Sequence, residues 1–479
     1  MKKSLIIVTI CWLTMGLRAQ TEASKTLSGE TTVAPVGAIS FPVSGGEATA
    51  VDTADGDSVA TMSTGEGLVA DSLLATDEPA NADSLLVTDE PVCADSLPYP
   101  ENLRQRLDAL LQSRLLQRTQ LGLMVWDLTA DSCVYRYQER QTLRPASTMK
   151  LLTAITAIDR LGGDYQLRTR LCYTGTISNG TLNGTLYCVG GMDPMFTTDD
   201  LTAFVESLRR QGVDTIRGRI VADRSFKEPE LLGEGWCWDD DNPTLSPLLV
   251  DKKADFISVF TAKLKRAGIT VVGNASKRSE VGNASMRSVV GNASQRSAQL
   301  IALRCHSLSE VLLTMMKESD NLFAESVFYN VEATSGNLPA RATDATRQER
   351  ALIERCGLDA SPYRLADGSG LSLYNYLSAE LEVALLRYAY QHEDIYNTLI
   401  PSLPIAGSDG TLKKRMKGTP AENNVQAKTG TLTGVIALAG YLTAANGHRL
   451  CFSIINQGTL KASEARDFQD KVCTILCEP

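Results

Sequence analysis

The chain has 479 residues, more than one ordinary domain of about 150 residues, so two or three domains are expected. Hydrophobic residues make up 43% and charged residues 22%, values typical of a soluble globular enzyme and too polar for a multispanning membrane protein. The formal net charge of -9 gives no attraction for nucleic acid, so no nucleic acid is expected among the partners.

The first 19 residues (1–19) are typical of a secretory signal peptide. Lys2 and Lys3 precede an apolar run that ends at Leu17, and Ala19 is a small residue at a suitable cleavage position. The alternative is an N-terminal membrane anchor, but the run is shorter than the ~20 residues that span a bilayer. We therefore expect an exported, periplasmic protein whose mature chain has no membrane span.

Residues 20–98 are predicted to form a disordered acidic tether. They contain fourteen Asp and Glu against one Lys, Lys25, and they are rich in Thr, Ser, Ala and Gly. Such a composition buries too little apolar surface to offset the chain entropy lost on folding. A degenerate 12-residue repeat, Ala-Asp-Ser-Leu-Leu, begins at Ala70, Ala82 and Ala94, and its prolines favour a linker over a solenoid.

The two ends of the remaining chain predict one α/β domain. Leucines at helical spacing predict a helix over 101–120, and alternating apolar residues predict a hairpin over 121–128 and 133–137. Near the C-terminus, strands are predicted over 425–429, 436–442 and 450–456, with a hairpin turn at Asn446-Gly447, followed by a helix over 462–476. A sheet assembled from both ends assigns 99–164 and 300–479 to one domain.

The middle, residues 165–299, is then an inserted domain. Short strand signals occur at 167–177, 185–189, 216–222 and 270–272, which predict a mainly β domain. A second repeat, Val-Gly-Asn-Ala-Ser-x-Arg-Ser, occupies 272–297 on a nine-residue period. Its Gly, Asn and Ser residues favour turns, so we interpret it as an expanded surface loop.

Cysteines provide one candidate cross-link. Cys172 and Cys188 flank a predicted hairpin at Asn179-Gly180 and could lie opposite one another. Because a disulfide between directly paired strands is strained, two buried thiols are the favoured alternative. Cys473 and Cys477 have no nearby histidine, so no metal site is expected there.

The most specific chemical signal is Ser147-Thr-Met-Lys150, the only Ser-x-x-Lys in the chain. Pro145 suits the entry to a helix, and a spacing of three places the hydroxyl and the amine one turn apart on one face. A serine hydroxyl needs a base, and a lysine can serve when its pKa is depressed. The three histidines, His306, His392 and His448, leave few candidates for a triad. In isolation, a solvated serine and lysine on a surface helix would explain the pattern.

Two further motifs follow in order. Ser319-Asp-Asn321 lies between helical stretches, where Ser319 could relay a proton and Asn321 could offer an amide, although a helix N-cap is the simpler explanation. Lys428-Thr429-Gly430-Thr431 lies on a predicted strand, where Lys428 would help keep Lys150 neutral and, with Thr429, would bind a carboxylate. Gly430 would let a substrate backbone approach the strand, although a strand-end turn is the alternative.

Together the three motifs match the signature of penicillin-recognising serine enzymes, and the chain from about residue 100 resembles the penicillin-binding protein 4 family of D-alanyl-D-alanine carboxypeptidases and endopeptidases. Five further motifs support the resemblance: Gly191-Met-Asp-Pro194, Gly235-Trp-Cys-Trp-Asp-Asp240, Ser319 to Glu325, Asp367-Gly-Ser-Gly-Leu-Ser372 and Gly407-Ser-Asp-Gly-Thr-Leu412. From the residues alone, the last two read as tight turns, and Trp236 and Trp238 as packing residues.

The resemblance implies a transpeptidase or β-lactamase-like domain, an antiparallel sheet flanked by helices, with an insertion that looks shorter than in the larger family members. Ser147 would be the acylated nucleophile and Lys150 its base, with Ser319 as proton relay. Asn321, Lys428, Thr429, Gly430 and Thr431 would bind substrate, and the backbone N–H groups of Ser147 and Thr431 would form the oxyanion hole. The substrates would be peptidoglycan stem peptides, with β-lactams as inhibitors, and no metal or cofactor is expected.

Two other functions use the same residues. A β-lactamase would hydrolyse its acyl-enzyme rapidly through a positioned water, but no separate motif for that step is apparent. A non-catalytic sensor would bind cell wall without turnover, but Ser147 and Lys150 are intact. The sequence therefore favours a serine D-alanyl-D-alanine carboxypeptidase, with D,D-endopeptidase activity and the oligomeric state left open.

Overall fold

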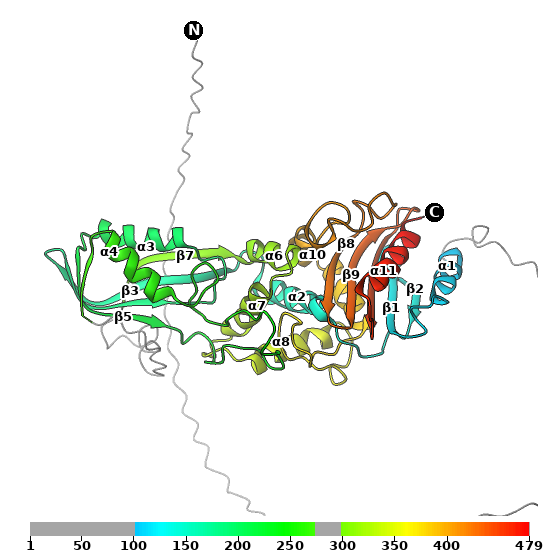
Figure 1. Cartoon of the computed structure of the whole chain (residues 1–479), viewed down its shortest axis with the longest axis horizontal. Helices are drawn as coiled ribbons and strands as arrows, with labels where there is room; N and C mark the ends of the chain where they lie inside the picture. The colour runs from blue at the N-terminus through cyan, green and yellow to red at the C-terminus, as the bar shows by residue number, and fades with distance from the viewer. Residues whose placement is uncertain (1–100, 274–297, 479) are drawn as a thin grey trace, which may run out of the picture. The chain divides into compact units, whose positions relative to one another are not determined.

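The computed structural model describes residues 101–273 and 298–478 (Figure 1). By its contacts the chain divides into two units, Met1–Leu86 and Val87–Pro479, and all described residues lie in the second. The predicted signal peptide, the predicted tether and nearly all of the 272–297 repeat lie outside the described residues.

A five-stranded antiparallel sheet joins the two ends of the described chain in the order β2-β1-β10-β9-β8. Its strands are β1 (Gln120–Asp127), β2 (Ser132–Tyr137), β8 (Gln426–Leu432), β9 (Val435–Thr443) and β10 (Arg449–Gln457). All five predicted strands are present, because alternating apolar residues and hairpin turns specify them locally. The helix predicted over 101–120 is shorter than expected. It ends as α1 (Glu101–Leu111), and the chain continues through turns closed by backbone hydrogen bonds between residues three apart.

Helices cover both faces of this sheet. Leu123 and Val125 of β1 pack with α1 and α11 (Ala462–Cys477), whereas Met124 packs with the helices of the other face, as the two-residue period of a strand requires. The helices of that other face are α2 (Met149–Leu161), α6 (Leu308–Lys317), α7 (Asn321–Ala333), α8 (Ala342–Arg355), α9 (Ala379–Gln391) and α10 (Glu393–Leu399). The predicted antiparallel sheet flanked by helices is confirmed.

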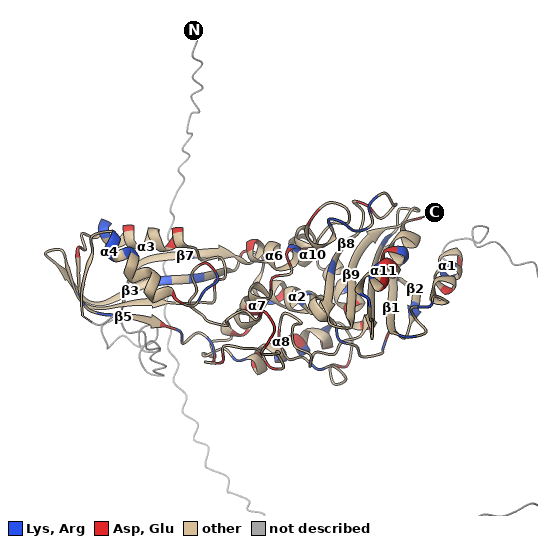
Figure 2. Cartoon of the chain, viewed as in Figure 1, with Lys and Arg blue, Asp and Glu red and all other residues tan. Residues whose placement is uncertain are grey.

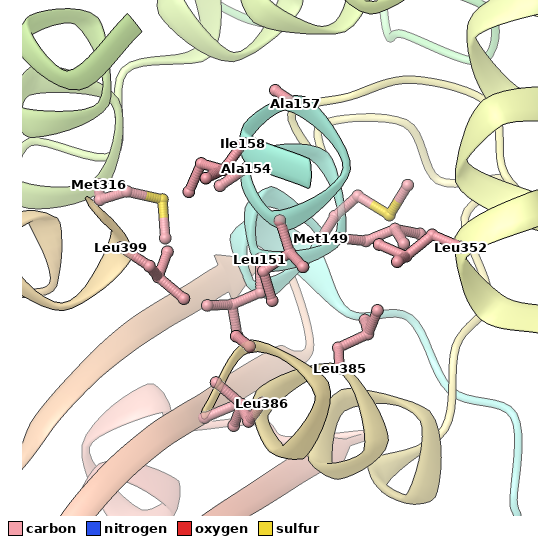
Figure 3. Packing of buried hydrophobic residues seen from close by; sticks show 14 of the residues in the cluster. Met149, Leu151, Ala154, Ala157, Ile158, Met316, Leu352, Leu385, Leu386 and Leu399 are labelled. Atoms are coloured by element: carbon pink, nitrogen blue, oxygen red, sulfur yellow. The ribbon is translucent and has the colours of Figure 1, made fainter. Parts of the chain in front are cut away.

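Helix α2 lies at the centre of this helical layer. Every residue from Met149 to Ile158 is buried. Its apolar side chains contact Leu352 of α8, Leu385 and Leu386 of α9 and Leu399 of α10 (Figure 3). Gly162, with φ +75°, ends the helix in a backbone conformation that other residues adopt at a cost. The helix that carries Ser-x-x-Lys is therefore held on several sides, not exposed on a surface.

The middle of the chain forms a second five-stranded sheet, in the order β6-β5-β4-β3-β7. Its strands are β3 (Gln166–Ser178), β4 (Thr181–Val189), β5 (Thr215–Asp223), β6 (Thr270–Val272) and β7 (Gln299–Ser307), and it packs with α3 (Thr198–Arg210) and α4 (Phe256–Arg266) around a separate core. Because β7 pairs with β3, this sheet ends at Ser307, eight residues beyond the predicted end of the insertion.

The register of this sheet separates the candidate disulfide partners. Cys172 lies opposite Tyr187 and Cys188 lies opposite Leu171, so the two cysteines are one residue out of register and on opposite faces. Both are free thiols, as are Cys473 and Cys477, which are buried in α11. The favoured prediction of two buried thiols is therefore confirmed, and the register excludes a disulfide between Cys172 and Cys188.

Basic and acidic residues are interspersed along the described chain, and the last turn of α4 carries three basic residues, Lys263, Lys265 and Arg266 (Figure 2). Among the helices of 101–273 and 298–478, none is long and apolar enough to cross a membrane.

Candidate active site

Ser147 and Lys150 lie where a short 3-10 helix, η2 (Ala146–Thr148), runs into α2. Ser147 is half-buried and Lys150 is fully buried. The Lys150 Nζ lies 3.0 Å from Ser147 Oγ, 2.7 Å from Asn321 Oδ1 and 2.7 Å from the carbonyl oxygen of Ser369. A neutral amine satisfies all three contacts: it donates two N–H groups to the amide and carbonyl oxygens and accepts the serine proton. The geometry therefore suits Lys150 as the base for Ser147.

Burial also favours the neutral amine. Desolvation lowers the pKa of Lys150 to about 8, and the nearby carboxyl groups of Asp367, Glu325 and Asp320 oppose this effect without cancelling it. An amine with a pKa near 8 has a useful neutral fraction at physiological pH.

The Ser319-Asp-Asn segment caps a helix and also faces the two lysines. Asp320 is the N-cap of α7, because its side chain accepts a hydrogen bond from the backbone N–H of Phe323. Ser319 adopts a positive φ of 59°. This turn directs the Ser319 hydroxyl to Lys428, at 2.8 Å, and the Asn321 amide to Lys150. The segment therefore both caps helix α7 and directs polar side chains to Lys150 and Lys428.

Lys428 lies on β8, the edge strand of the first sheet, and is fully buried. Its Nζ contacts Ser319 Oγ and the carbonyl oxygen of Thr429, each at 2.8 Å. Burial first, and the charge of Lys150 second, hold the pKa of Lys428 well below its usual range. Burial, not Lys428, is the main cause of the lowered pKa of Lys150.

The remaining residues of the third motif have different environments. The Thr429 hydroxyl contacts that of Thr411, at 2.8 Å, and Thr431 is exposed. A Cβ atom on Gly430 would lie 2.6 Å from the carbonyl oxygen of Pro145. The missing side chain thus lets the turn that contains Ser147 approach β8. The sequence had suggested another reason for this glycine, the approach of a substrate backbone to the strand.

The Asp367–Ser372 loop, read from its residues as a tight turn, supplies the carbonyl that Lys150 contacts. The Asp367 carboxylate accepts hydrogen bonds from the backbone N–H groups of Gly370 and Ser372, at 2.8 and 2.7 Å. Gly370 has φ +79°, and a Cβ atom there would lie 1.8 Å from the carbonyl oxygen of Ala146. The loop is a turn and also packs directly on the segment that contains Ser147.

Glu325, the last residue of the longer motif from Ser319 to Glu325, supports the same loop from α7. Its Oε1 accepts from the backbone N–H groups of Gly368 and Ser369, at 3.1 and 2.8 Å. Burial and the neighbouring Asp367 raise the pKa of Glu325 to about 8. Sequence reasoning missed this role and that of the Ser369 carbonyl, since no pattern identifies which backbone oxygen faces an amine.

The two tryptophans differ. Trp236 is partly buried and its Nε1 donates to Asp367 Oδ2 at 2.7 Å, so it links the loop after β5 to the Asp367–Ser372 loop. Trp238 is 89% exposed, and its prediction as a packing residue is wrong. It lies in an irregular loop followed by three aspartates, which favour solvent.

The Gly407–Leu412 segment holds Thr411 beside β8. Asp409 accepts from the backbone N–H of Ile405 at 2.8 Å and pairs with Lys317 Nζ at 2.6 Å. These contacts fix the turn that leads into the short 3-10 helix η4 (Gly410–Leu412), to which Thr411 belongs.

The fold is an antiparallel sheet flanked by helices. Ser-x-x-Lys starts a buried helix, Ser-x-Asn caps another and Lys-Thr-Gly lies on an edge strand. This combination defines a serine peptidase of the penicillin-binding class. The model of the D-Ala-D-Ala carboxypeptidase 3 (S13) family matches residues 103–248 and 244–478, and the chain belongs to this family. The predicted family resemblance is confirmed.

Individual relatives agree. The chain is 29% identical over 450 residues to a D-alanyl-D-alanine carboxypeptidase of Actinomadura sp. strain R39, covering 74% of this chain and 81% of the relative. It is 27% identical over 418 residues to D-alanyl-D-alanine carboxypeptidase DacB of Haemophilus influenzae, covering 71% and 86%. The crystal structure of penicillin binding protein 4 from H. influenzae matches with a TM-score of 0.68 and 24% identity over 78% of this chain and 99% of that one, which shows a shared fold.

Proposed function

We propose that the chain hydrolyses the terminal D-Ala-D-Ala bond of peptidoglycan stem peptides through an acyl-enzyme on Ser147. The observation that carries this proposal is the buried Lys150 amine 3.0 Å from the Ser147 hydroxyl, with two other acceptors that leave its lone pair for the serine proton. Membership in a D-Ala-D-Ala carboxypeptidase family supports the substrate class.

Acylation then runs as follows. Lys150 takes the Ser147 proton, and Oγ attacks the carbonyl carbon of the penultimate D-Ala. The backbone N–H groups of Ser147 and Thr431 stabilise the oxyanion. As the C–N bond breaks, Ser319 relays the proton from Lys150 to the nitrogen of the departing D-Ala, which returns Lys150 to its neutral form. Water then hydrolyses the ester with Lys150 as base again.

The terminal carboxylate of the substrate binds at Lys428 and Thr429, with Gly430 and Thr431 beside it, while Asn321 holds the peptide carbonyl. Burial lowers the pKa of Lys428, and an arriving carboxylate acts in the opposite direction, because it favours the charged amine. Binding of the substrate carboxylate therefore stabilises positive charge at Lys428.

We also propose that the protein acts in the periplasm, after removal of residues 1–19, and that β-lactams inhibit it by acylating Ser147. Cleavage of D,D cross-links is the second activity to test, since it breaks the same kind of bond. Incubation with intact cross-linked muropeptides measures it directly.

The test compares the wild type with Ser147→Ala, using Ser361→Ala, a change at an exposed serine, as the control. Separate samples of each protein are incubated with labelled penicillin and with a D-Ala-D-Ala pentapeptide. Durable labelling and D-alanine release, both lost only in Ser147→Ala, support the proposal. Rapid loss of label with penicillin hydrolysis would instead indicate a β-lactamase, and labelling without peptide turnover a sensor.

A further inference from the structure

Two threonines of the nucleophile segment each make two hydrogen bonds in the buried core. Thr148 Oγ1 lies 2.7 Å from the carbonyl oxygen of Pro145 and 2.5 Å from Glu382 Oε1. Thr153 Oγ1 lies 2.8 Å from the carbonyl oxygen of Gly368 and 2.9 Å from Glu349 Oε1. Both pairs therefore join one hydroxyl to one backbone carbonyl and one carboxyl group.

The number of protons in each pair constrains the carboxyl groups. A hydroxyl has a single proton, and a backbone carbonyl can only accept. If each threonine donates to its carbonyl, the second hydrogen bond exists only when the carboxyl group donates a proton to the threonine. A carboxylate has no proton to donate, so it would have to share the one hydroxyl proton with the carbonyl, and two full hydrogen bonds at each threonine require neutral acids at Glu382 and Glu349.

The surroundings of both glutamates agree with this requirement. Glu382 on α9 is fully buried, and its other oxygen accepts from the Ser453 hydroxyl at 2.6 Å. Glu349 on α8 is 1% exposed, and its Oε2 has no hydrogen-bond partner, which costs less for the carbonyl of a neutral acid than for a carboxylate. In the described part of the chain, neither glutamate forms an ion pair. Burial raises the pKa of Glu382 to about 7 and that of Glu349 well above its usual value.

We propose that Glu382 and Glu349 are neutral carboxylic acids that position the nucleophile and its base, an inference that rests on the proposed roles of Ser147 and Lys150. Glu382, through Thr148, fixes the turn that contains Ser147. Glu349, through Thr153, holds the carbonyl group of Gly368. The next residue, Ser369, has the carbonyl oxygen that accepts the hydrogen bond from Lys150. Neither glutamate touches the reacting atoms, so both are positioning residues.

The first experiment measures the positioning effect in the full chain. Glu382→Gln and Glu349→Gln retain a group that donates to the threonine, whereas Glu382→Met and Glu349→Met remove it at similar volume. We expect the glutamine variants to be acylated by labelled penicillin within about threefold of the wild-type rate, and the methionine variants to lose about tenfold to a hundredfold, as for a catalytic group displaced by a fraction of an ångström. Methionine variants that fold and react at the wild-type rate would overturn the proposal.

Because a methionine variant could fail to fold, a second pair tests the same contact. Thr148→Ser keeps the hydroxyl and Thr148→Val removes it. Rescue by serine but not valine, with circular dichroism spectra unchanged, supports a positioning role. Equal rates in the two variants would contradict it.

The second experiment measures the proton itself. At about pH 6, where an ordinary glutamate is ionised, the infrared spectrum of the wild type should contain carbonyl bands of neutral carboxylic acids that disappear in the glutamine variants. Absence of these difference bands would overturn the neutral state. The bands do not depend on turnover, so they distinguish this proposal from the proposed function: failure of acylation in the wild type would reject the function and leave the bands in place.

Discussion

Acylation of Ser147 should depend steeply on pH, because the neutral amine of Lys150 is the base in the proposed mechanism. With a Lys150 pKa of about 8, only about one molecule in eleven carries the neutral amine at pH 7, and about one in a hundred at pH 6. The rate constant for acylation is therefore expected to rise about tenfold per pH unit up to about pH 7, by about fivefold between pH 7 and 8, and then to level off.

The assay is the second-order rate constant for labelling by a fluorescent penicillin, measured in single turnover between about pH 5.5 and 9.5 so that deacylation does not contribute. Lys150→Met should be inactive across the whole range. Lys461→Met, which changes a lysine that is 74% exposed, is the control and should reproduce the wild-type profile.

Two results would refute this reasoning. A rate that is flat between pH 6 and 8 would mean that the neutral amine does not limit acylation. A rate that keeps rising towards the ordinary lysine pKa of 10.5 would mean that burial does not depress the pKa of Lys150 as its environment implies.

Three further predictions concern the walls of the site. Gly370→Ala places a side chain at a positive φ, at a cost of about 1–3 kcal/mol, and brings its Cβ against the carbonyl oxygen of Ala146. Penicillin labelling should be lost. Labelling at the wild-type rate would contradict the close approach of residue 370 to Ala146. Trp236→Phe removes a hydrogen bond to a buried carboxylate and should lower the free energy of unfolding by about 1–3 kcal/mol. Trp238→Ala, at an exposed residue, should change it by less than about 0.5 kcal/mol. Equal losses of the two variants in urea denaturation would contradict this contrast. Thr411→Val removes the hydroxyl partner of Thr429, which we propose binds the substrate carboxylate, and should raise KM about threefold to tenfold with kcat little changed. An unchanged KM would argue against this role of Thr411.

Sequence reasoning succeeded where the signal is local. The strands of the first sheet follow from alternating apolar residues and hairpin turns, and their predicted bounds differ from the observed ones by only a few residues. Ser147, Lys150, Ser319 and Lys428 were found because serine and lysine at fixed spacings have few common structural explanations once three motifs occur in order. The structure brings all four together.

Features that depend on distant partners were not predictable. Strand β7 has no clear alternation, and only its pairing with β3 makes it a strand of the second sheet. Glu349 occurs in a helix rich in charged residues and Glu382 in the acidic first turn of another helix, two places where a glutamate usually faces solvent. The packing of α8 and α9 against α2 buries them. Trp238 shows the opposite case, since an aromatic residue predicts burial only when a core lies beside it.

The position of β10 between β1 and β9 has a consequence for biosynthesis. This strand is among the last segments to be synthesised, and the first hairpin cannot join β9 and β8 without it. Until residue 457 is available, Lys428 therefore lacks the framework that sets it opposite Ser319. The contacts around the Ser147 hydroxyl are therefore completed only after the strand that ends at residue 457 has been synthesised.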